Sequence, residues 1–340
     1  MTATIRDIAR MARVSTATVS LVFSGNARIS ARTRAKVQRV ARRMRYVPNI
    51  GARNLRRGAS NLIGFIVNDI TDPFYGIMVQ VAEAAAMERG YQLIIADNQW
   101  NPEREIAAIE KIVSLRARGL LLCSTERTDL PMKLLTDAGL PVVLLDTCPP
   151  GYKGCFIGND VMAAGRLAAT HLLEAGCRNP VFLTANQPLL SFSGFMAMRE
   201  GFLRVLRKRR LGQLARRVVR AGLTIDEGRD AFHRVRASAP DVDGVFCAND
   251  LCALGVMAAA DEAGLRVGRD LAVMGIDDLA IARLPRIGLT SLRQPHEQIA
   301  RTAAHVLIES FEQGRYPGIR QLFQPELVIR QSSRLSRAKR

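Results

Sequence analysis

The chain has 340 residues, of which 48% are apolar and 24% charged, which predicts two or three folded domains and excludes a wholly disordered chain. Its apolar runs are too short to cross a bilayer and its first 13 residues lack an apolar core, so we expect neither a membrane span nor a signal peptide. Residues 1–60 hold 14 of the 49 basic residues but one of the 31 acidic residues, hence +13 of the net +18, which predicts a polyanionic partner, either nucleic acid or an anionic membrane.

The cysteines and the missing catalytic signatures narrow the class of protein. Six cysteines occur without a CxxC pair, which is typical of a reduced cytoplasmic protein with buried thiols. The sequence contains no GxxxxGK[ST] loop, no GxGxxG after a strand and no GxSxG turn. Its four histidines are dispersed, and no His or Cys residues have zinc-ligand spacing. We therefore expect no enzyme, no catalytic residues, no metal and no cofactor.

The first 45 residues predict three short helices. The first helix has one apolar face with the spacing i, i+3, i+4, i+7, formed by Ile5, Ile8, Ala9 and Ala12. Ser15 is a suitable N-cap for a second helix over Thr16–Phe23, and Ser30 can cap a third. The third helix should end before Tyr46-Val47-Pro48, because a residue that precedes proline avoids the α region.

The first two helices and their tight turn predict a helix-turn-helix motif. The second helix should enter the major groove, so its outward positions should be short and able to contact base edges, as Thr16, Ala17, Ser20 and Leu21 are. An ordinary three-helix bundle with a solvated face is the alternative. A membrane-surface helix fits less well, because the basic residues lie on several helices without one large apolar face.

After residue 60 the chain changes character. Short apolar runs typical of buried strands recur at residues 62–67, 92–96, 120–123, 142–145, 181–183, 245–247 and 272–276. Stretches of helical length, such as residues 75–89 and 103–118, lie between several of them. Strands that alternate with helices predict βαβ units and an α/β fold of doubly wound parallel sheets. About 270 such residues are long for one domain, so we expect two lobes.

Short motifs follow one another along nearly the whole chain in a fixed order. They are Val14-Ser15-Thr16-Ala17-Thr18-Val19-Ser20, Ser30-Ala31-Arg32-Thr33-Arg34, Tyr46-Val47-Pro48-Asn49, Asp72-Pro73-Phe74-Tyr75, Asn249-Asp250, Ala253-Leu254-Gly255, Gly264-Leu265-Arg266-Val267, Gly275-Ile276-Asp277-Asp278 and Pro325-Glu326-Leu327-Val328-Ile329-Arg330. This ordered set resembles the lactose-repressor (LacI/GalR) family of bacterial transcription regulators.

The resemblance implies an all-α helix-turn-helix headpiece before a two-lobed core like that of periplasmic binding proteins. The expected division is residues 1–48 for the headpiece, 49–60 for a hinge helix and linker, 61–159 plus 293–322 for the N-terminal lobe, 160–292 plus 323–332 for the C-terminal lobe, and 333–340 for a basic tail. The chain should cross between the lobes three times, near Asn159, Leu292 and Phe323.

The resemblance also aligns Ala52-Arg53-Asn54-Leu55 with the family's hinge helix. A helix this short is marginal in water, so we expect two hinges to order together on DNA and to push Leu55 of each chain into a minor-groove step. A flexible linker with Leu55 packed on its own core is the alternative. The expected DNA-binding residues are Thr4, Ser15, Thr16, Ala17, Thr18, Ser20, Leu21, Asn26, Arg53 and Leu55.

A small-molecule effector should bind between the lobes, because ligands of open α/β sheets lie beyond the carboxyl ends of the strands. The resemblance assigns to this site Phe74, Tyr75, Asp146, Met198, Arg199, Phe246, Asn249, Asp277 and Gln294. Some of these residues have plainer interpretations, since Phe74 and Phe246 could be core residues. Asp250 and Asp278, which follow strands as well, could be helix N-caps.

Two positions depart from the family pattern. Leu21 stands where the family commonly has a basic or polar residue, so base recognition there must rest on apolar contact, such as a thymine methyl group. Met198 stands where the family often has an arginine that grips ligand oxygens, with Arg199 beside it. Either Arg199 substitutes through a local shift, or the ligand lacks that grip.

These observations predict a cytoplasmic, homodimeric repressor of a carbohydrate or related catabolic operon. It should bind a pseudo-palindromic operator in double-stranded DNA and respond to a sugar or sugar derivative. The tail after Arg330 lacks a leucine heptad, so we expect no coiled-coil tetramer. The alternatives are an α/β enzyme acting on a sugar or nucleoside, or a binding protein of the periplasmic kind, with an incidental basic extension.

Overall fold

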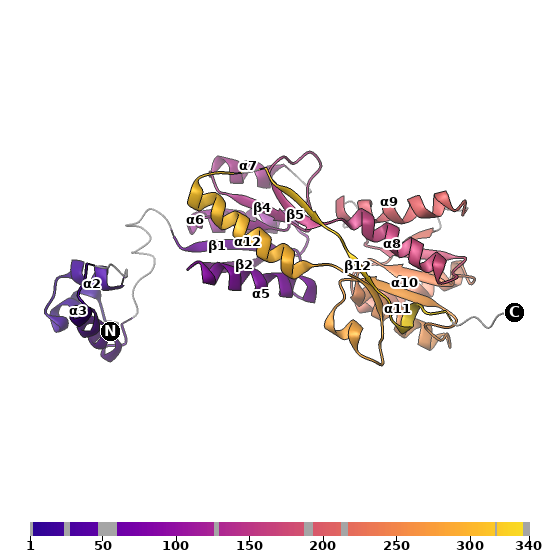
Figure 1. The fold of residues 1–340 in the computed structure, drawn as a ribbon, viewed down its shortest axis with the longest axis horizontal. Helices are drawn as coiled ribbons and strands as arrows, with labels where there is room; N and C mark the ends of the chain where they lie inside the picture. The colour runs from indigo at the N-terminus through magenta and orange to yellow at the C-terminus, as the bar shows by residue number, and fades with distance from the viewer. Residues whose placement is uncertain are drawn as a thin grey trace. The chain divides into compact units, whose positions relative to one another are not determined.

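The computed structural model describes residues 3–23, 28–46, 60–125, 129–186, 193–211, 217–316 and 318–335. The chain divides into two compact units, Met1–Ser60 and Asn61–Arg340. The first unit is all-α and the second is α/β (Figure 1). Within the described ranges, no helix is long and apolar enough to cross a membrane.

The first unit contains the headpiece helices α1 (Ile5–Ala12), α2 (Thr16–Phe23) and α3 (Ala31–Arg43), as the sequence predicted. Each helix begins at a hydroxyl side chain that accepts a backbone N–H bond. Thr4 forms a reciprocal capping box with Asp7, while Ser15 Oγ accepts from the amide of Thr18 at 3.0 Å. Small apolar side chains make the core, namely Ile8, Ala9, Ala12, Val19, Val22, Val37 and Ala41.

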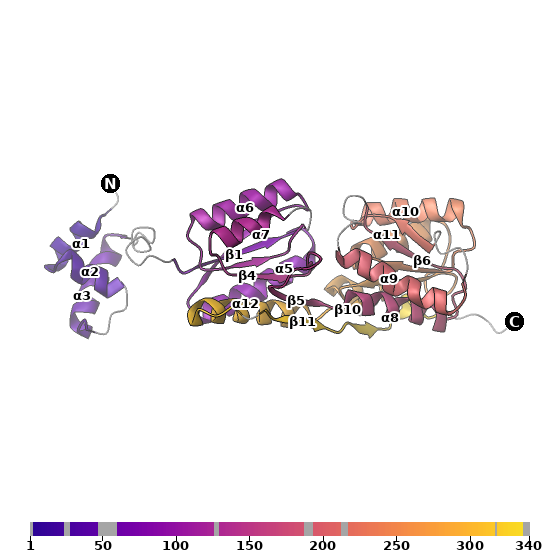
Figure 2. The same ribbon diagram turned by 90° about the horizontal axis from the view of Figure 1, so that it is seen from above.

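The N-terminal lobe of the second unit is built on a six-stranded sheet with the order β11-β5-β4-β3-β1-β2, all parallel. Its strands are β1 (Leu62–Val67), β2 (Gln92–Asp97), β3 (Leu120–Leu122), β4 (Val142–Leu145), β5 (Cys155–Asn159) and β11 (Arg320–Phe323). Its helices are α5 (Pro73–Glu88), α6 (Pro102–Ser114), α7 (Leu130–Asp137) and α12 (His296–Gln313). Helices α5 and α12 cover one face of the sheet, and α6 and α7 cover the other (Figure 2).

The C-terminal lobe repeats this design with the strand order β12-β10-β9-β8-β6-β7, in which only β12 is antiparallel to its neighbour. Its strands are β6 (Pro180–Thr184), β7 (Val218–Arg220), β8 (Gly244–Cys247), β9 (Ala272–Ile276), β10 (Thr290–Arg293) and β12 (Glu326–Val328). Its helices are α8 (Val161–Glu174), α9 (Ser193–Lys208), α10 (Ile225–Ser238) and α11 (Asp250–Glu262), with short 3₁₀ turns η3 (Ala280–Arg283) and η4 (Gln331–Ser333). Both lobes confirm the predicted doubly wound α/β fold.

Three segments of chain join the two lobes: β5 leads into α8, β10 leads into α12, and β11 leads into β12 (Figure 1). The crossings therefore follow Asn159, Arg293 and Phe323. Three adjacent crossings allow the lobes to change their angle while each lobe keeps its own core.

Helices α8 and α9 pack unusually close together, because each contributes a glycine to their contact. A Cβ atom at Gly165 would meet the carbonyl oxygen of Met198, and one at Gly201 would meet that of Met162, both well inside the 3.0 Å that Cβ atoms essentially never approach. The close packing fixes the position of α9, whose first turns carry Phe195 and Met198. All six cysteines are buried and free, as the sequence predicted.

Candidate functional site

Helix α2 presents a surface of short side chains away from the headpiece core. Ser15, Thr16 and Ala17 are exposed at its start, whereas Val19 and Val22 are buried beneath. Leu21 is 38% exposed on the next turn. Thr18 and Ser20 are half-buried, and Thr4 is exposed as the cap of α1. Short exposed side chains on the second helix of such a motif suit close approach to base edges in a major groove.

The headpiece surface is strongly basic. Its described basic residues are Arg6, Arg10, Arg13, Arg28, Arg32, Arg34, Lys36, Arg39, Arg42, Arg43 and Arg45. The one acid in the headpiece, Asp7, is committed to the α1 cap, where hydrogen bonds from Thr4 hold its pKa below the ordinary value. The large excess of positive charge over negative charge in the headpiece attracts phosphates. Three predicted DNA-binding residues, Asn26, Arg53 and Leu55, lie outside the described residues.

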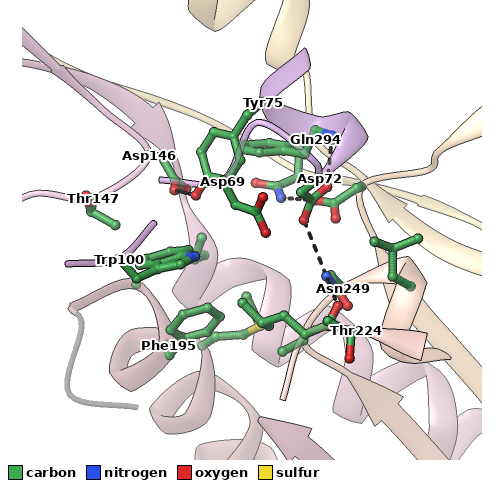
Figure 3. Close-up of a pocket in the computed structure, with 18 of the residues that line it drawn as sticks. Asp69, Asp72, Tyr75, Trp100, Asp146, Thr147, Phe195, Thr224, Asn249 and Gln294 are labelled. Carbon is green, nitrogen blue, oxygen red and sulfur yellow. Dashed lines mark hydrogen bonds between the residues drawn. The ribbon is translucent and has the colours of Figure 1, made fainter. Parts of the chain in front are cut away.

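A cavity of about 110 Å³ lies between the lobes of the second unit (Figure 3). A single buried water needs only about 10–15 Å³, so the cavity can hold a small organic molecule. The N-terminal lobe contributes Asp69, Thr71, Asp72, Phe74, Tyr75, Trp100, Asp146 and Thr147 to its lining. The C-terminal lobe and the crossings contribute Val161, Gly194, Phe195, Met198, Leu223, Thr224, Ala248, Asn249, Leu251, Asp277 and Gln294.

The start of α5 organises the N-terminal wall of this pocket. Asp72 caps the helix by accepting the amide of Phe74 at 2.9 Å, and Pro73 occupies its first turn. Tyr75 Oη donates to Asp146 Oδ2 at 2.8 Å and accepts from Asn68 Nδ2 at 3.3 Å. The carboxylate after β4 is thus tied to the helix after β1.

Aromatic rings from both lobes meet at the pocket. Trp100, which follows β2, lies 6.4 Å from the ring of Tyr75 and 6.1 Å from that of Phe195, measured between ring centroids. Phe74 and Tyr75 lie edge to face at 5.0 Å. Phe195 belongs to α9 of the opposite lobe, so the Trp100–Phe195 pair spans the cleft (Figure 3). A flat, partly apolar ligand could lie against these rings.

Amide side chains connect the lobes on the other side of the pocket. Asn249 caps α11 by accepting the amide of Cys252 at 2.9 Å, and its Nδ2 atom reaches Asp72 Oδ2 across the cleft at 3.5 Å. Gln294, on the crossing from β10 to α12, donates to Asp277 Oδ1 at 2.6 Å and accepts from Asn159. The crossings after β5 and after β10 are therefore in contact, through Asn159 and Gln294, with groups that line the pocket.

Three pocket residues have backbone angles that non-glycine residues rarely adopt. Trp100, Asp146 and Asp277 have φ values of 57°, 61° and 116°. The last two come directly after β4 and β9. Such conformations cost free energy and concentrate at binding sites, where the surrounding structure holds them.

Carboxylates dominate the electrostatics of the pocket. Burial, the largest cause, and then the nearby charges of Asp72 and Asp250 raise the pKa of Asp277 well above its ordinary value. Burial also raises the pKa of Asp72. Burial and the neighbouring carboxylates thus destabilise the charged forms of these groups.

Two residues expected at the effector site lie elsewhere. Phe246 is fully buried and packs 4.8 Å from Phe182 and 6.1 Å from Phe202, so it belongs to the core of the C-terminal lobe and its assignment to the ligand was wrong. Arg199 does not line the pocket, whereas Met198 does, because the two point from different faces of α9. No local shift brings Arg199 into the place of Met198.

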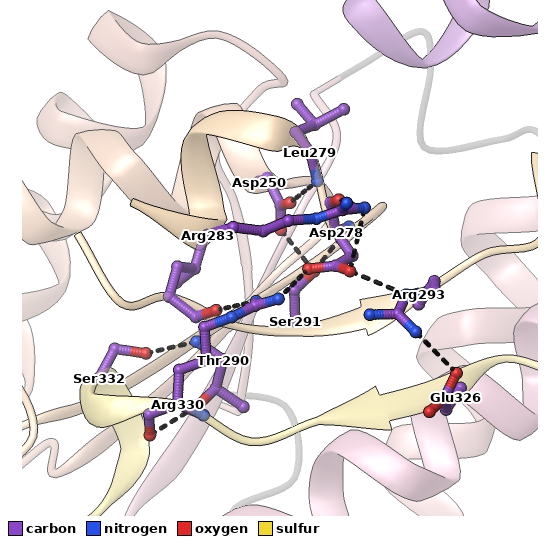
Figure 4. A network of polar contacts seen from close by, with 11 residues as sticks. Asp250, Asp278, Leu279, Arg283, Thr290, Ser291, Arg293, Glu326, Arg330 and Ser332 are labelled. Atoms are coloured by element: carbon purple, nitrogen blue, oxygen red, sulfur yellow. Dashed lines mark hydrogen bonds and ion pairs between the residues drawn. The ribbon is translucent and has the colours of Figure 1, made fainter. Parts of the chain in front are cut away.

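The helix-cap interpretation of Asp250 and Asp278 was also wrong, since Asn249 caps α11. Asp250 accepts from the amide of Leu279 at 2.8 Å and from Ser291 Oγ at 2.7 Å, and burial raises its pKa to about 7. Asp278 is fully buried and forms ion pairs with three arginines (Figure 4), namely Arg283, Arg293 and Arg330. This cluster, which we call the Asp278 cluster, ties β10 to the segment after β12.

Several lining residues were missed by sequence reasoning. Asp69, Thr71, Trp100, Thr147, Phe195 and Thr224 belong to loops or helix starts with no signature of their own. A usable signal existed for Asp72, since Asp-Pro at a strand-to-helix junction is a strong cap signal.

Two family models match the chain. Residues 4–49 match the family described as bacterial regulatory proteins, lacI family. Residues 169–333 match the periplasmic binding protein-like domain. The first match covers the headpiece helices, and the second covers most of the C-terminal lobe and the returning crossings.

Curated proteins and solved structures agree with these matches. The HTH-type transcriptional regulator GalR of Escherichia coli (strain K12) is 29% identical over 330 residues, covering 97% of this chain and 95% of GalR. The HTH-type transcriptional repressor PurR of Yersinia pestis (strain Pestoides F) is 29% identical over 333 residues, covering 97% and 96%.

Among solved structures, the regulator CelR in complex with cellobiose has a TM-score of 0.74 at 27% identity, covering 97% of this chain and 99% of CelR. The Lac repressor dimer bound to operator has the same fold, with a TM-score of 0.85 at 24% identity, covering 99% and 100%. Together with the headpiece and the two-lobed core, these likenesses show that the chain belongs to the LacI/GalR family of effector-controlled, DNA-binding transcriptional regulators, which are not enzymes.

Proposed function

We propose that the chain is a cytoplasmic homodimer that represses a carbohydrate-related catabolic operon by binding a pseudo-palindromic operator. The exposed, short side chains of α2 and the basic headpiece support sequence-specific binding to DNA. The expected base contacts come from Ser15, Thr16, Ala17, Thr18, Ser20 and Leu21. Thr4, at the cap of α1, is assigned to a backbone phosphate together with the arginines.

The observation that supports control by a small molecule is the pocket described above, which is lined by both lobes and by a crossing segment. A ligand that touches Trp100 on one lobe and Asn249 on the other favours one lobe angle over the alternatives. Such a ligand changes operator affinity by a coupling free energy of about 1–3 kcal/mol. CelR holds cellobiose in its complex, which supports a small-molecule effector for the related pocket of this chain.

The division of the chain belongs to the same proposal. Residues 1–48 read DNA, residues 49–60 form the hinge, and residues 61–332 make the receptor in two lobes, followed by the basic tail. We assign Leu55 in the hinge to a minor-groove base step, where an apolar wedge partly unstacks the bases and bends the duplex.

The homodimer has a candidate surface on the N-terminal lobe. Strand β2 is an edge strand, and Ile95 on it is 45% exposed. Met87 on the adjacent α5 is 64% exposed. Exposed edges with large apolar side chains favour association with another chain. The Lac repressor is a dimer on its operator, in line with this assignment.

Two measurements test the proposal. Purified protein should bind DNA from upstream of its own gene in fluorescence anisotropy, with log K falling linearly with log salt by about 0.9 per neutralised phosphate. Absence of salt-dependent binding to any promoter fragment would remove the regulator assignment. Met87→Glu with Ile95→Glu should convert a dimer to a monomer in light scattering, whereas Leu322→Glu on the opposite edge strand β11 should not.

A further inference from the structure

The effector pocket has an unusual charge balance. It presents four carboxylates, those of Asp69, Asp72, Asp146 and Asp277, while none of its described lining residues is Lys, Arg or His. We propose that the effector carries a positively charged nitrogen, as an amine, guanidinium or quaternary ammonium group, on a compact and partly apolar body. This inference rests on the proposed function, in which this pocket is the effector site.

Neutral groups hold three of these carboxylates, those of Asp69, Asp72 and Asp277, in place. Asp69 Oδ1 accepts from the amide of Thr71 at 2.9 Å and from its hydroxyl at 2.6 Å. Asp72 accepts the amide of Phe74 and faces an amide of Asn249 at 3.5 Å, and Asp277 accepts an amide of Gln294. These donors orient the carboxylates without adding positive charge to the pocket. The carboxylate of Asp69 points into the open space beside Trp100 and Phe195 (Figure 3).

The negative charges of the pocket carboxylates lie in a partly buried space, where water compensates them poorly. Asp277 is only 4% exposed, and its neighbours include Asp72, so ionising both carboxylates there is unfavourable. A cationic ligand removes this repulsion on binding. An acid or a phosphate ester increases it, and a neutral sugar leaves it unchanged. The sign of the field inside the pocket therefore selects among effector classes.

A metal ion does not fit the arrangement as well as an organic cation. Across the described part of the chain, no group of three or more His, Cys, Asp and Glu side chains could hold a metal ion. The carboxylates are instead distributed around a cavity of about 110 Å³, so the charge they favour belongs to a molecule that fills it.

The aromatic lining independently favours a cation. Tyr75, Trp100 and Phe195 form a chain of rings with centroid separations of 6.4 and 6.1 Å around the cavity. Ring faces attract ammonium and guanidinium groups, and tryptophan does so most strongly. Met198 completes this wall with a polarisable thioether. Rings and carboxylates around one cavity are the combination that recognises alkylated or primary amines.

The test is a thermal-shift panel on the full chain with matched probes. Each cation is paired with its neutral counterpart: glucosamine with glucose, galactosamine with galactose, and choline with 3,3-dimethylbutan-1-ol. Agmatine, spermidine and glucuronate complete the panel. At least one cation should raise Tm in a concentration-dependent way, while its neutral partner and glucuronate do not.

Two variants locate the effect. Asp69→Asn and Asp72→Asn should each weaken binding of the stabilising cation at least tenfold in calorimetry. Asp226→Asn removes the same charge from an exposed first-turn position on α10, outside the pocket, and should leave the affinity unchanged. Equal losses in all three variants would mean that only the overall charge of the protein matters, against the proposal.

The remaining outcomes are decisive as well. Equal stabilisation by a neutral sugar, stabilisation by glucuronate, or no response to any cation overturns the inference. Promoter binding is measured by anisotropy on the same preparations. A protein that binds promoter DNA and responds to a neutral sugar keeps the proposed function and loses this inference, whereas one that binds no promoter DNA loses the proposed function itself.

Discussion

The Asp278 cluster should contribute far more to stability than a surface ion pair of the same composition. Asp278 has no exposed side-chain surface, and the side chains of its partners Arg330, Arg293 and Arg283 are 16%, 40% and 55% exposed. Removing one partner of a buried pair costs about 3–5 kcal/mol. When Asp278 is removed, two of the arginines remain partly hydrated. We therefore expect Asp278→Ala to lower the free energy of unfolding by about 3 kcal/mol, the lower end of that range.

A matched control lies in the same lobe. Arg266 and Asp270 form a pair at 2.9 Å whose side chains are 60% and 33% exposed. Asp270→Ala should cost far less unfolding free energy than Asp278→Ala, because water replaces most of the interaction. Urea denaturation followed by circular dichroism measures both variants. Equal losses of unfolding free energy would refute the reasoning that burial of the Asp278 cluster decides its strength.

Three further predictions concern helix packing, the pocket and the hinge. Gly201→Ala should lower the free energy of unfolding by about 1–3 kcal/mol and weaken effector binding, because its Cβ would displace α9 from α8. Gly194→Ala is the control and should keep the thermal stability, because a Cβ there meets nothing within 4 Å. Asp277→Asn should stabilise the ligand-free protein increasingly as pH rises. The stability that Asp277 contributes is fully present below its unfolded pKa of about 3.8 and is lost as pH rises through its raised folded pKa, so a gap in Tm that is flat from pH 4 to 8 would contradict the assignment. Leu55→Ala should weaken operator binding far more than binding to random DNA in anisotropy, and an equal loss on both would exclude the minor-groove wedge.

Most of the strands that the sequence predicted share one physical property. Strands such as β1, β6 and β9 are buried on both faces of a parallel sheet and therefore consist of continuous apolar runs. Two of the missed strands, β10 and β11, lack such runs. The edge strand β11 is mostly exposed, and β10 buries Thr290 and Ser291, whose hydroxyls are satisfied by Ser333 and Asp250. Their polar side chains conceal them from a hydropathy pattern.

The residues of the candidate site also fall into two groups, those that the sequence could predict and those that it could not. Asp146 and Asp277 could be expected at the pocket because they come directly after strands, and the carboxyl ends of parallel strands meet at one edge. Trp100 and Phe195 could not, because their contact exists only where two lobes distant in sequence come together. Phe246 was misassigned because alternation along β8 decides which face it occupies, and the short run Gly244–Cys247 shows no alternation.

The coupling between lobe angle and DNA binding can be measured without knowing the effector. Asp72→Cys with Asn249→Cys places two thiols where the native side chains approach to 3.5 Å across the cleft, while the six native cysteines are buried. Bridging these thiols with a short bifunctional reagent holds the lobes at one angle. We expect operator affinity in anisotropy to change by about 5- to 150-fold against the unbridged double variant, with no change in wild-type protein given the same reagent. An unchanged operator affinity in the bridged protein would contradict control of the headpiece by the pocket.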